Sequence, residues 1–456
     1  MPSASREVQE YHETTKHQFH QYARGPGYLD WASQPDPFRR YEGAPLILLE
    51  RPSAEETVLY DPVMNGSLPP ARPLTRLSLS TLLFHSLALS AWKQAGSEKW
   101  ALRVSPSSGN LHPTEAYVIC GQVEGLHGSP AVFHYAPKVH GLELRAVLPD
   151  TIWRELAEGL PPGGALLALS SIPWRESWKY GERAYRYCQL DVGHALGAIS
   201  VAAAGLGWRA LLMDHFSTDQ VAALCGLADS EGPESEHADC LVALIPESSA
   251  AIAQTSTTRG ADPSVLAALD WQGRPNQLSR SHARWELIDD VAAACKKPPT
   301  DWEWPFSETM PSVQEEQPVR PMSLSRIVRQ RRSAVSMDGV SSMERTDFFR
   351  MLQRLVAAEA RPPFCSLPWS SRAHLAVFVH RVSGLRQGLY FLCRNNGEEA
   401  ALKQSMQDHF LWERPAGCPE ALPFFLLMDG DMRKVATQVS CYQDIAGEGC
   451  FSVAMI

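Results

Sequence analysis

The sequence has no excess of positive charge and no cysteine pattern that would hold a metal or a disulfide framework. Its 456 residues carry 42 Lys and Arg against 51 Asp and Glu. This balance excludes a dedicated nucleic-acid binder, because no surplus of cations is present to displace phosphate counterions. The ten cysteines are scattered singly, and His12, His17 and His20 lack carboxylate or cysteine companions at metal-site spacing. We therefore expect no metal site, and reduced thiols in a cytoplasmic protein.

Long apolar runs are also missing. The start of the chain is polar and lacks the apolar stretch that an exported protein needs. The most apolar segment, residues 192–208, contains His194, Ser200 and several glycines, and it is too short for a membrane span of about 20 apolar residues. It predicts a helix buried inside a soluble protein that does not bind a membrane.

The chain does have enough apolar residues for a core, since 44% are hydrophobic and 20% are charged. Its length indicates two or three domains. A polar, proline-rich stretch that carries Trp302 and Trp304 separates two blocks. We expect a first domain at 1–252, a linker or strap at 253–321 and a second domain at 322–456.

Hydrophobic spacing predicts an α+β protein in which helices outweigh strands. Helical spacing covers Ser80–Trp92, Arg183–Leu206, Thr218–Leu227 and Arg345–Glu359. Short apolar runs bounded by Gly, Pro or Ser predict buried strands at Ala116–Cys120, Ala165–Leu169 and Leu241–Ile245.

The two blocks show a faint internal repeat. Residues 116–126 match 375–385, and Cys188–Val192 matches Cys441–Ile445. On this alignment the chain stops two residues before the counterpart of Gly205, which begins the Gly205–Gly207 turn, so we expect the second copy to lack its final strand.

A serine-rich turn, residues 103–113, precedes the strand predicted at Ala116. Its three serines and its glycine, with Arg103 nearby, supply N–H and O–H donors that suit a phosphate or the polar edge of a heterocycle. The same composition is common in surface turns that bind nothing. The residues alone leave both interpretations open.

Lys179 stands four positions before Arg183 in an aromatic and charged segment. On a helix the two cations would be neighbours, and like charge with aromatic burial favours the neutral amine that a general base needs. Tyr180 beside it could donate or relay a proton. The alternative is a solvated helix face on which Glu176 and Glu182 pair with the cations.

The segment Gly205-Leu206-Gly207-Trp208-Arg209-Ala210 fits the dinucleotide pattern G-x-G-x-x-A, but its context is wrong. That pattern follows a strand and opens a helix, whereas helical spacing precedes these glycines and a strand-like run follows them. A helix that ends in glycine is the better interpretation.

Three residues at the opening of the second block, Arg331-Arg332-Ser333, form a basic cluster. Guanidinium groups offer a planar fork of donors that suits a phosphate. An exposed basic run is the commoner explanation, and the cluster by itself does not decide between them.

Taken together, the motifs resemble the nitroreductase-like flavin oxidoreductases, and within them the SagB/ThcOx-type dehydrogenases, which include azoline oxidases of peptide natural-product pathways. The matching segments follow the family's order, and they are Tyr11–His17, Ser105–Glu115, Lys179–Tyr187, Asp191–His194 and Gly205–Gly207. The resemblance covers residues 8–248. Residues 322–456 resemble a second, degenerate copy that lacks the serine-glycine turn and the Lys-Tyr pair.

The resemblance implies a nitroreductase-like α+β fold that binds FMN at the interface of two such units, here an internal pseudo-dimer with one working site. It assigns cofactor binding to Lys16, Arg103, Ser105, Pro106, Ser107, Ser108, Gly109, Leu111, Gly205, Leu206, Gly207, Arg331, Arg332 and Ser333. It assigns catalysis to Lys179, which removes a Cα proton from the substrate, and to Tyr180, which helps, while hydride passes to flavin N5.

The substrate class implied is a small molecule or a modified peptide, such as one that carries an azoline. One alternative is an NAD(P)H-dependent reductase of nitro or quinone compounds. Another is a non-catalytic, peptide-binding subunit with the same fold, which the degenerate second copy and the tryptophan-bearing strap favour. Further homo-oligomerisation is compatible with each of them.

Overall fold

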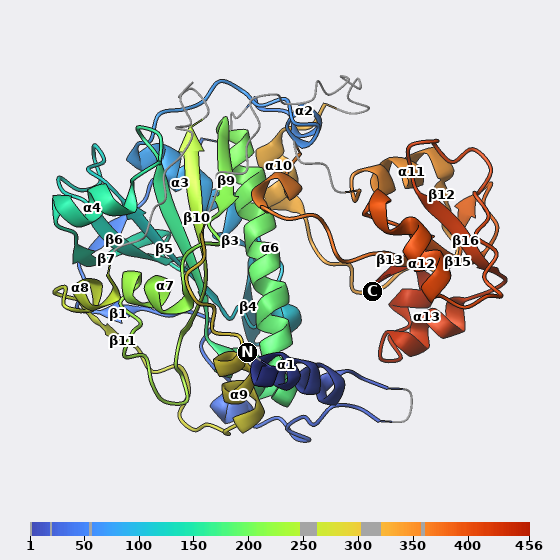
Figure 1. Ribbon diagram of the computed structural model, residues 1–456, viewed down its shortest axis with the longest axis horizontal. Helices are drawn as coiled ribbons and strands as arrows, with labels where there is room; N and C mark the ends of the chain where they lie inside the picture. The colour runs from blue at the N-terminus through green and yellow to red at the C-terminus, as the bar shows by residue number, and fades with distance from the viewer. Residues whose placement is uncertain (1, 19–20, 54–56, 247–261, 302–320, 357–360) are drawn as a thin grey trace. The chain divides into compact units, whose positions relative to one another are not determined.

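The computed structural model describes residues 2–18, 21–53, 57–246, 262–301, 321–356 and 361–456. These residues form two compact units, the first made of Met1–Arg331 with Ala360–Pro368 and the second of Arg332–Glu359 with Trp369–Ile456 (Figure 1). Both units mix helices and strands in the predicted α+β manner. The boundary between them lies at residue 331, ten residues beyond the boundary that composition predicts.

The first unit is built on a seven-stranded antiparallel sheet with the order β2-β7-β6-β5-β8-β10-β9. Its strands are β2 (Leu46–Leu48), β5 (Thr114–Cys120), β6 (Ala131–Ala136), β7 (Gly141–Val147), β8 (Ala165–Ser171), β9 (Trp208–Leu212) and β10 (His237–Pro246). All three predicted strands are confirmed as parts of β5, β8 and β10.

The helices of the first unit are α1 (Pro2–Thr15), α2 (Tyr60–Met64), α3 (Arg76–Ser86), α4 (Asp150–Leu156), α5 (Pro173–Tyr180), α6 (Ala184–Gly205), α7 (Thr218–Leu224), α8 (Pro263–Ala267), α9 (Glu286–Ala294) and α10 (Leu324–Gln330). Short 3-10 turns lie at Trp31–Ser33, Ser108–Asn110, Gly181–Arg183 and Phe364–Ser366. None of the described helices is both long enough and apolar enough to cross a membrane.

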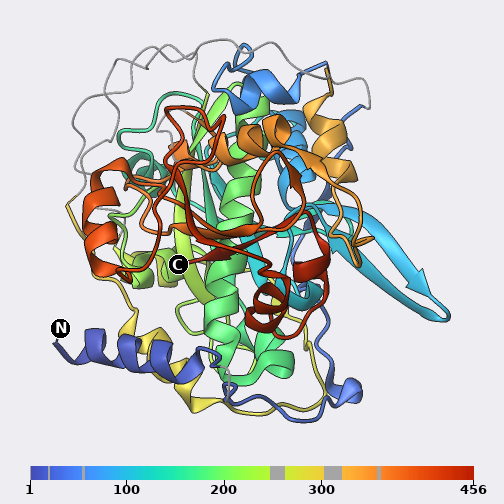
Figure 2. The same cartoon turned by 90° about the vertical axis from the view of Figure 1, so that its right-hand side faces the viewer.

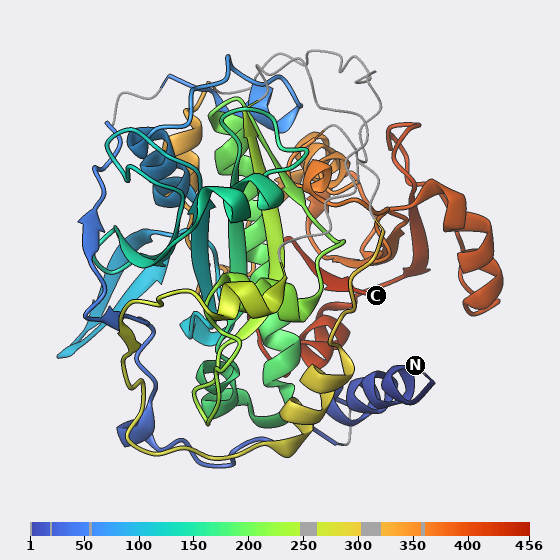
Figure 3. The same ribbon diagram turned by 60° about the vertical axis from the view of Figure 1, so that its left-hand side comes forward.

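The central strands are buried on both faces, which explains their continuous apolar sequences. In β5, Ala116 and Val118 belong to the core shared with α3 and α6, whereas Tyr117 and Ile119 belong to the core shared with α4, α7 and α8. Helix α6 runs along one face of the sheet in Figure 1, and the opposite layer comes forward in Figure 3. The sheet is therefore the middle of three layers.

The predicted helix at Ser80–Trp92 is wrong in its second half. Helix α3 ends at Ser86, and β3 (Leu89–Ala95) pairs with β4 (Glu98–Arg103) in a two-stranded hairpin that projects from the unit (Figure 2). The exposed residues of β3 and β4 pair with each other across the hairpin. This cross-strand pairing overrides the helical spacing of the apolar residues.

Part of the predicted linker is folded onto the first unit. Strand β11 (Arg274–Pro275) pairs with β1 (Tyr41–Glu42), and α9 contacts α1 and α6. The Glu234 carboxylate accepts hydrogen bonds from the backbone of Leu278 and Ser279 at 2.8 and 2.7 Å. This stretch is therefore a strap, while its two predicted anchors, Trp302 and Trp304, lie outside the described residues.

The second unit is a four-stranded antiparallel sheet with the order β16-β15-β13-β17. Its elements are β12 (Met343–Glu344), α11 (Arg345–Gln353), β13 (Leu375–Val379), β14 (Val382–Ser383), β15 (Gly388–Leu392), the 3-10 turn Asn396–Glu398, α12 (Glu399–Ser405), β16 (Phe424–Asp429), α13 (Arg433–Val439), α14 (Ile445–Glu448) and β17 (Phe451–Met455). Phe348 and Leu352 of α11 pack on Val377 and Phe424. Helix α11 ends at Gln353, so residues 354–356 of the predicted helix Arg345–Glu359 are not helical, and residues 357–359 lie outside the described residues.

The first half of the predicted repeat has structural support. The order β16-β15-β13-β17 matches β7-β6-β5-β8, with antiparallel pairing throughout. The turn after each inner strand is also the same: Gly125 and Gly384 have φ of 74° and 76°, and the following residue donates its N–H to a carbonyl three positions earlier. Both glycines hold a left-handed conformation that other residues adopt with strain.

The second half of the predicted repeat is wrong. Cys188–Val192 lies inside the 22-residue helix α6, whereas Cys441 has a φ of 56° and precedes the four-residue helix α14. Strand β17 follows and takes the place of β8. Within the described residues the second unit therefore has no counterpart of α5, α6, β9 or β10, whereas the prediction was that one strand is missing. The prediction failed because a match of five residues does not determine the backbone conformation.

A chain of buried charges crosses the first sheet. Glu115 accepts hydrogen bonds from Arg175 and from His134 Nε2, the latter at 3.0 Å, and His134 Nδ1 lies 2.9 Å from Glu143. Burial alone would raise the pKa of Glu115, but Arg175 and His134 outweigh it and bring this pKa to about 2. The same two carboxylates outweigh burial at His134 and raise its pKa, so the imidazolium donates to both.

Replacing His134 should be costly because two buried carboxylates would lose a partner. We expect His134→Phe to lower the free energy of unfolding by about 3 to 5 kcal/mol, measured by urea unfolding of the full chain near neutral pH. The matched variant His134→Gln keeps one N–H donor and should lose less. A His134→Phe protein as stable as the wild type would contradict this account.

Candidate functional site

The register of β5 and β8 places two predicted motifs side by side. Thr114 pairs with Ser171 across these antiparallel strands, so the turn that leads into β5 lies beside α5, which follows β8. Ile172 N–H donates to the Pro113 carbonyl at 2.9 Å. The serine-rich turn and the Lys-Tyr pair, some seventy residues apart in the sequence, are therefore neighbours.

Helix α5 has defined ends. Pro173 stands at its first position, where a missing N–H costs nothing, and Gly181 ends it with a φ of 56°. The spacing predicts that Lys179 and Arg183 are neighbours on one helix face. Because the helix stops at Gly181, they are not. Arg183 instead hydrogen-bonds to the Thr15 carbonyl and to the Tyr187 hydroxyl.

Three side chains of α5 fix its position. Trp174 Nε1 donates to Ser279 Oγ at 2.7 Å, and Trp178 Nε1 donates to the Asp30 carbonyl at 3.0 Å. Arg175 Nη1 donates to the His112 carbonyl at 2.8 Å and also bonds to Glu115. The helix is thus tied both to the strap and to the serine-rich turn.

Gly109 is the point of closest approach between the turn and the pair. A Cβ built on it would lie 2.7 Å from Tyr180 Oη and 3.2 Å from Lys179 Nζ. Gly109 is exposed and has a φ of 58°. Only glycine satisfies both the conformation and the space, so the amine and the phenol converge on a bare, open stretch of backbone.

The Asp191 carboxylate on α6 accepts hydrogen bonds from the serine-rich turn. Ser108 donates to its Oδ1 from the backbone N–H at 3.0 Å and from the hydroxyl at 3.2 Å. The Ser107 hydroxyl accepts from the His112 N–H at 2.8 Å. The hydrogen bonds of Ser107 and Ser108 therefore hold the turn in shape. The sequence predicted instead that their hydroxyls donate to a ligand.

Glu176 lies on α5 one turn before the pair and is completely buried. Neither of its carboxylate oxygens has a hydrogen-bond partner in the described part of the chain. Burial, and then the negative charge of Asp191, raises the pKa of Glu176 well above its ordinary value, while Lys179 opposes the shift. The alternative in which Glu176 is a solvated partner of a cation is therefore wrong. Glu182 does pair with a cation, but at 3.4 Å from Arg24 and not with the predicted Lys179 or Arg183.

Tyr180 keeps its proton. Burial, followed by the charges of Glu176, Tyr187 and Asp191, raises the pKa of its phenol. Its ring also lies against that of Tyr187, with centroids 4.5 Å apart. Tyr180 is thus a hydrogen-bond donor.

Other predicted residues of the turn serve the fold. Arg103 is buried, its guanidinium donates to the carbonyls of Thr114 and Pro37 at 3.2 and 2.6 Å, and burial lowers its pKa to about 10. Leu111 packs in a cluster with Trp174 and Trp178. Ser105 is buried, Pro106 is half-buried, and Lys16 pairs with Glu13 at the end of α1.

The predicted glycine turn lies away from the pair. Gly205 ends α6, which begins next to Tyr180, so a helix of 22 residues separates them by about 30 Å. A Cβ on Gly205 would meet Leu324 at 2.4 Å, and one on Gly207 would meet the Pro69 carbonyl at 2.4 Å. These positions, with the buried Leu206, pack against protein, as a helix that ends in glycine does.

The basic cluster is divided between the two units. Arg331 ends α10 in the first unit, and its Nη2 donates to the Val104 carbonyl at 3.2 Å. It therefore lies at the start of the serine-rich turn. Arg332 and Ser333 are exposed and belong to the second unit.

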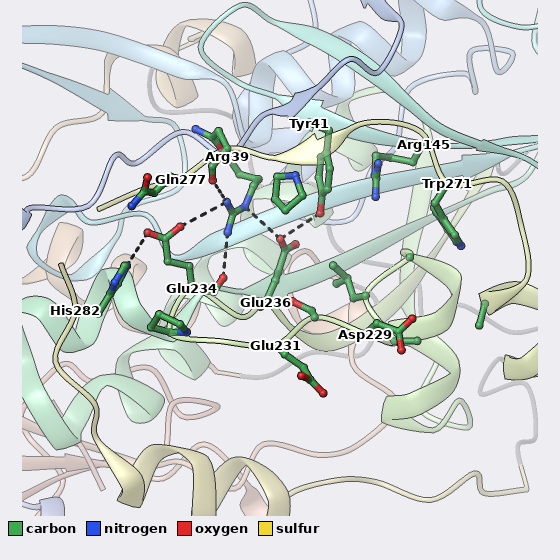
Figure 4. A pocket seen from close by; sticks show the side chains of 18 residues that line it. Arg39, Tyr41, Arg145, Asp229, Glu231, Glu234, Glu236, Trp271, Gln277 and His282 are labelled. Carbon is green, nitrogen blue, oxygen red and sulfur yellow. Dashed lines mark hydrogen bonds and ion pairs between the residues drawn. The ribbon is translucent and has the colours of Figure 1, made fainter. Parts of the chain in front are cut away.

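Two cavities of the first unit lie elsewhere. One, of about 630 Å³, is lined by Pro173, Trp174 and Ser177 on another face of α5. The other, of about 560 Å³, is lined by Arg39, Tyr41, Arg145, Glu234 and Glu236 among others (Figure 4).

Two carboxylates of the cavity in Figure 4, those of Glu234 and Glu236, are already engaged. Glu236 accepts from the hydroxyls of Tyr117 and Ser170 at 2.7 and 2.6 Å, and Glu234 accepts from the strap and from His282 at 2.8 Å. Glu234 thus holds the strap in place. Among the described residues no group of three or more His, Cys, Asp or Glu could hold a metal ion.

Sequence reasoning missed the contributions of Asp191 and Glu176 to this site. A usable signal existed for Glu176, because it precedes Lys179 and Tyr180 by three and four residues, which are neighbouring positions on a helix. No signal identified its burial, since a glutamate between tryptophans and a lysine is usually exposed.

Comparison with known proteins places this site in a family domain. Residues 90–243 match the nitroreductase family, so the first unit contains a nitroreductase family domain. A curated protein of Methanocaldococcus jannaschii, Putative nitroreductase MJ1384, is 24% identical over 155 residues, which are 33% of this chain and 73% of that protein.

Two solved structures extend the comparison. The crystal structure of a putative nitroreductase from Anabaena variabilis is similar over 98% of this chain and 84% of that chain, at 20% identity and a TM-score of 0.62. The predicted nitroreductase-like α+β fold is thereby confirmed. The E. coli microcin synthetase McbBCD complex covers 39% of this chain and 66% of its own, at 17% identity and a TM-score of 0.29, which is too low for a conclusion about fold.

The approach at Gly109 can be tested with a matched glycine. Gly96, in the β3–β4 hairpin, has the same φ of 58° but nothing within 4 Å of a built Cβ. Gly109→Ala and Gly96→Ala should each lose about 1 to 2 kcal/mol through backbone strain. Only Gly109→Ala should displace Tyr180 and Lys179, which would change the rate of Lys179 acylation as followed by peptide mass spectrometry. Equal acylation rates in both variants would contradict the contact.

Proposed function

We propose that this protein is an FMN-dependent oxidoreductase of the SagB type, which passes hydride from a small-molecule or modified-peptide substrate, such as a peptide azoline, to the flavin. The nitroreductase family domain supports a flavin-dependent oxidoreductase in general. The finer assignment is carried by one observation, the meeting of the serine-glycine turn with the Lys179–Tyr180 pair at Gly109.

The residues around the turn fit a flavin. Gly109 is exposed and carries no side chain of its own, so a flat ring can approach its backbone next to Tyr180 and Lys179. Arg331 lies at the start of the same turn and offers a cation to a phosphate. When bound, FMN would supply the hydride acceptor.

The two residues of the pair divide the proton chemistry. Lys179 Nζ would accept the proton that leaves the substrate carbon, because Tyr180 retains its own proton. Tyr180 Oη would donate a hydrogen bond that orients the substrate or stabilises developing negative charge. Both atoms lie beside Gly109, so one substrate can contact them together.

Three further predictions belong to this proposal. They are the internal pseudo-dimer to which Arg332 and Ser333 would contribute, a single working flavin site, and a cytoplasmic location. Lys16, Arg103 and the Gly205–Gly207 turn are left out of the proposed site because their described contacts are with protein groups.

Flavin binding is the first test. FMN titrated into the purified full-length protein should bind at one site per chain and give a yellow protein with flavin absorbance. Reduction of that bound flavin by substrate or NAD(P)H would also contradict a non-catalytic subunit. A protein that stays colourless after FMN is added would contradict the proposal.

Lys179→Ala separates the two candidate reactions. It should retain FMN and lose dehydrogenation of an azoline peptide by at least about 100-fold, because the proton acceptor is gone. Lys93→Ala, in the exposed hairpin, is the control and should leave turnover unchanged. Nitro-compound reduction by NAD(P)H that persists in Lys179→Ala, without azoline turnover in the wild type, would favour the reductase alternative.

A further inference from the structure

We propose that the cavity in Figure 4 binds a free amino acid as its zwitterion, with the ligand's carboxylate on Arg145 and its ammonium group at the carboxylates of Asp229 and Glu231. The cavity belongs to the first unit, and residues of β1, β7, the strap and the loop between α7 and β10 line it. It is separate from the Lys179–Tyr180 pair, so this proposal does not rest on the proposed function.

Arg145 enters the cavity from the sheet. Side chains alternate along β7, so Leu142 and Leu144 pack in the core shared with α6, whereas Arg145 turns to the opposite face. Arg145 is only 4% exposed. Its guanidinium carbon lies 3.5 Å from the centre of the Tyr41 ring and 5.6 Å from that of the Trp271 ring. These aromatic contacts hold the guanidinium in place.

Arg145 has few polar partners. Its Nη1 donates to the Gly273 carbonyl at 3.3 Å, its Nε has no hydrogen-bond partner, and no carboxylate of the described residues forms an ion pair with it. A cation that is taken out of water without an opposite charge is unfavourable. A carboxylate matches a guanidinium through two parallel hydrogen bonds. The unpaired cation therefore favours a ligand that brings a carboxylate.

Arg39 lines the same cavity but has the partners that Arg145 lacks. It is 3% exposed, and its Nε lies 3.7 Å from Glu236 Oε2, while its Nη1 lies 4.0 Å from Glu234 Oε2. Its Nη2 also donates to the Glu234 carbonyl at 3.1 Å. Of the two buried arginines of this cavity, one is paired and one is free to bind a ligand.

Two exposed carboxylates lie on the opposite side of the cavity from Arg145 (Figure 4). They belong to Asp229 and Glu231, and neither has a hydrogen bond or an ion pair with a described residue. The lining contains four carboxylates and two guanidinium groups, so a simple anion would meet net repulsion, whereas a zwitterion adds no net charge. A ligand with a carboxylate at one end and an ammonium group at the other complements both sides.

The cavity has room and an apolar wall for the rest of such a molecule. Its volume of about 560 Å³ lies within the range of small-molecule sites. Trp271 Nε1 donates to the Leu266 carbonyl at 3.2 Å, and its ring packs on Gly226, where a Cβ would come within 2.4 Å of it. Leu227 and Ala267 also line the cavity. The wall is therefore fixed and can contact the ligand's side chain.

Thermal unfolding of the purified full-length protein without cofactor tests the site. Each proteinogenic L-amino acid is added singly at about 10 mM, and at least one should raise the Tm by about 2 °C or more. Arg145→Met should abolish this rise, because the carboxylate loses its partner. Arg154→Met, which replaces an exposed arginine on α4, should retain it. The proposal is overturned if no amino acid raises the wild-type Tm, or if the rise persists in Arg145→Met.

Analogues of the amino acid that gives the largest rise identify its two ends. The analogue without the carboxylate and the analogue without the ammonium group should each bind at least about tenfold more weakly by isothermal titration calorimetry. The double variant Asp229→Asn, Glu231→Gln should weaken the amino acid by a similar factor and leave the analogue without the ammonium group unaffected. Equal affinity for either analogue, or an unchanged affinity in the double variant, would overturn the zwitterion assignment.

Stability without ligand separates a binding role of Arg145 from a structural one. Arg145→Met should leave the Tm unchanged or raise it, because an unpaired buried charge is removed. Arg39→Met is the matched variant and should lower the Tm, because Glu234 and Glu236 lose their cation. A Tm that falls as far in Arg145→Met as in Arg39→Met would show that Arg145 serves the fold, and it would overturn the proposal.

Discussion

Arg175 links the sheet, the turn and helix α5. One buried guanidinium bonds to the His112 carbonyl at the end of the turn and to Glu115 at the start of β5. Glu115 continues through His134 to Glu143, so the cation is one end of a chain of paired charges. Because a buried charge is tolerated only with such partners, α5 has one position relative to the turn, and Lys179 and Tyr180 take theirs from it.

In contrast to that chain of paired charges, the candidate site contains a buried carboxyl group without a described partner. Both carboxylate oxygens of Glu115 are hydrogen-bonded and its pKa is about 2, whereas Glu176 has no hydrogen-bond partner among the described residues and its pKa is raised well above the ordinary value. The surroundings alone therefore shift the pKa values of two glutamates of the same unit in opposite directions. Groups perturbed in this way are typical of functional sites, and Glu176 lies next to the pair that the fold presents at Gly109.

The two units show how one sheet topology can exist with and without this site. Both contain the same order of four strands, in which β5 and β13 are matching inner strands, and both contain the same glycine turn. Only the first unit has, in its described residues, a helix that comes after the β8 position and carries the pair. The second unit covers its sheet with α11 and shorter helices. The shared strands are therefore a scaffold, and the chemistry depends on the helix attached to the β8 position.

The sequence alone determined the elements whose residues carry a strong local signal. The apolar runs of β5, β8 and β10 could only be buried strands, and the spacing from Arg183 to Leu206 defined helix α6 to within one residue at each end. The ordered motifs also predicted the family-level fold and the two halves of the site. Where the local pattern was ambiguous, as at Leu89–Trp92 or Cys441–Ile445, it failed, because strand pairing and chain topology decided those segments.

Only the tertiary structure decided how the predicted residues divide between ligand and fold. Arg103 and Gly207 have the chemistry of a binding site, yet their neighbours are protein carbonyls and backbone. Glu176 has the sequence context of a surface residue, yet it is completely buried. Residue type fixes what a side chain can do, but burial and partners are set by segments far away in the chain, here by the register of Thr114 with Ser171 and by the ends of α5 and α6.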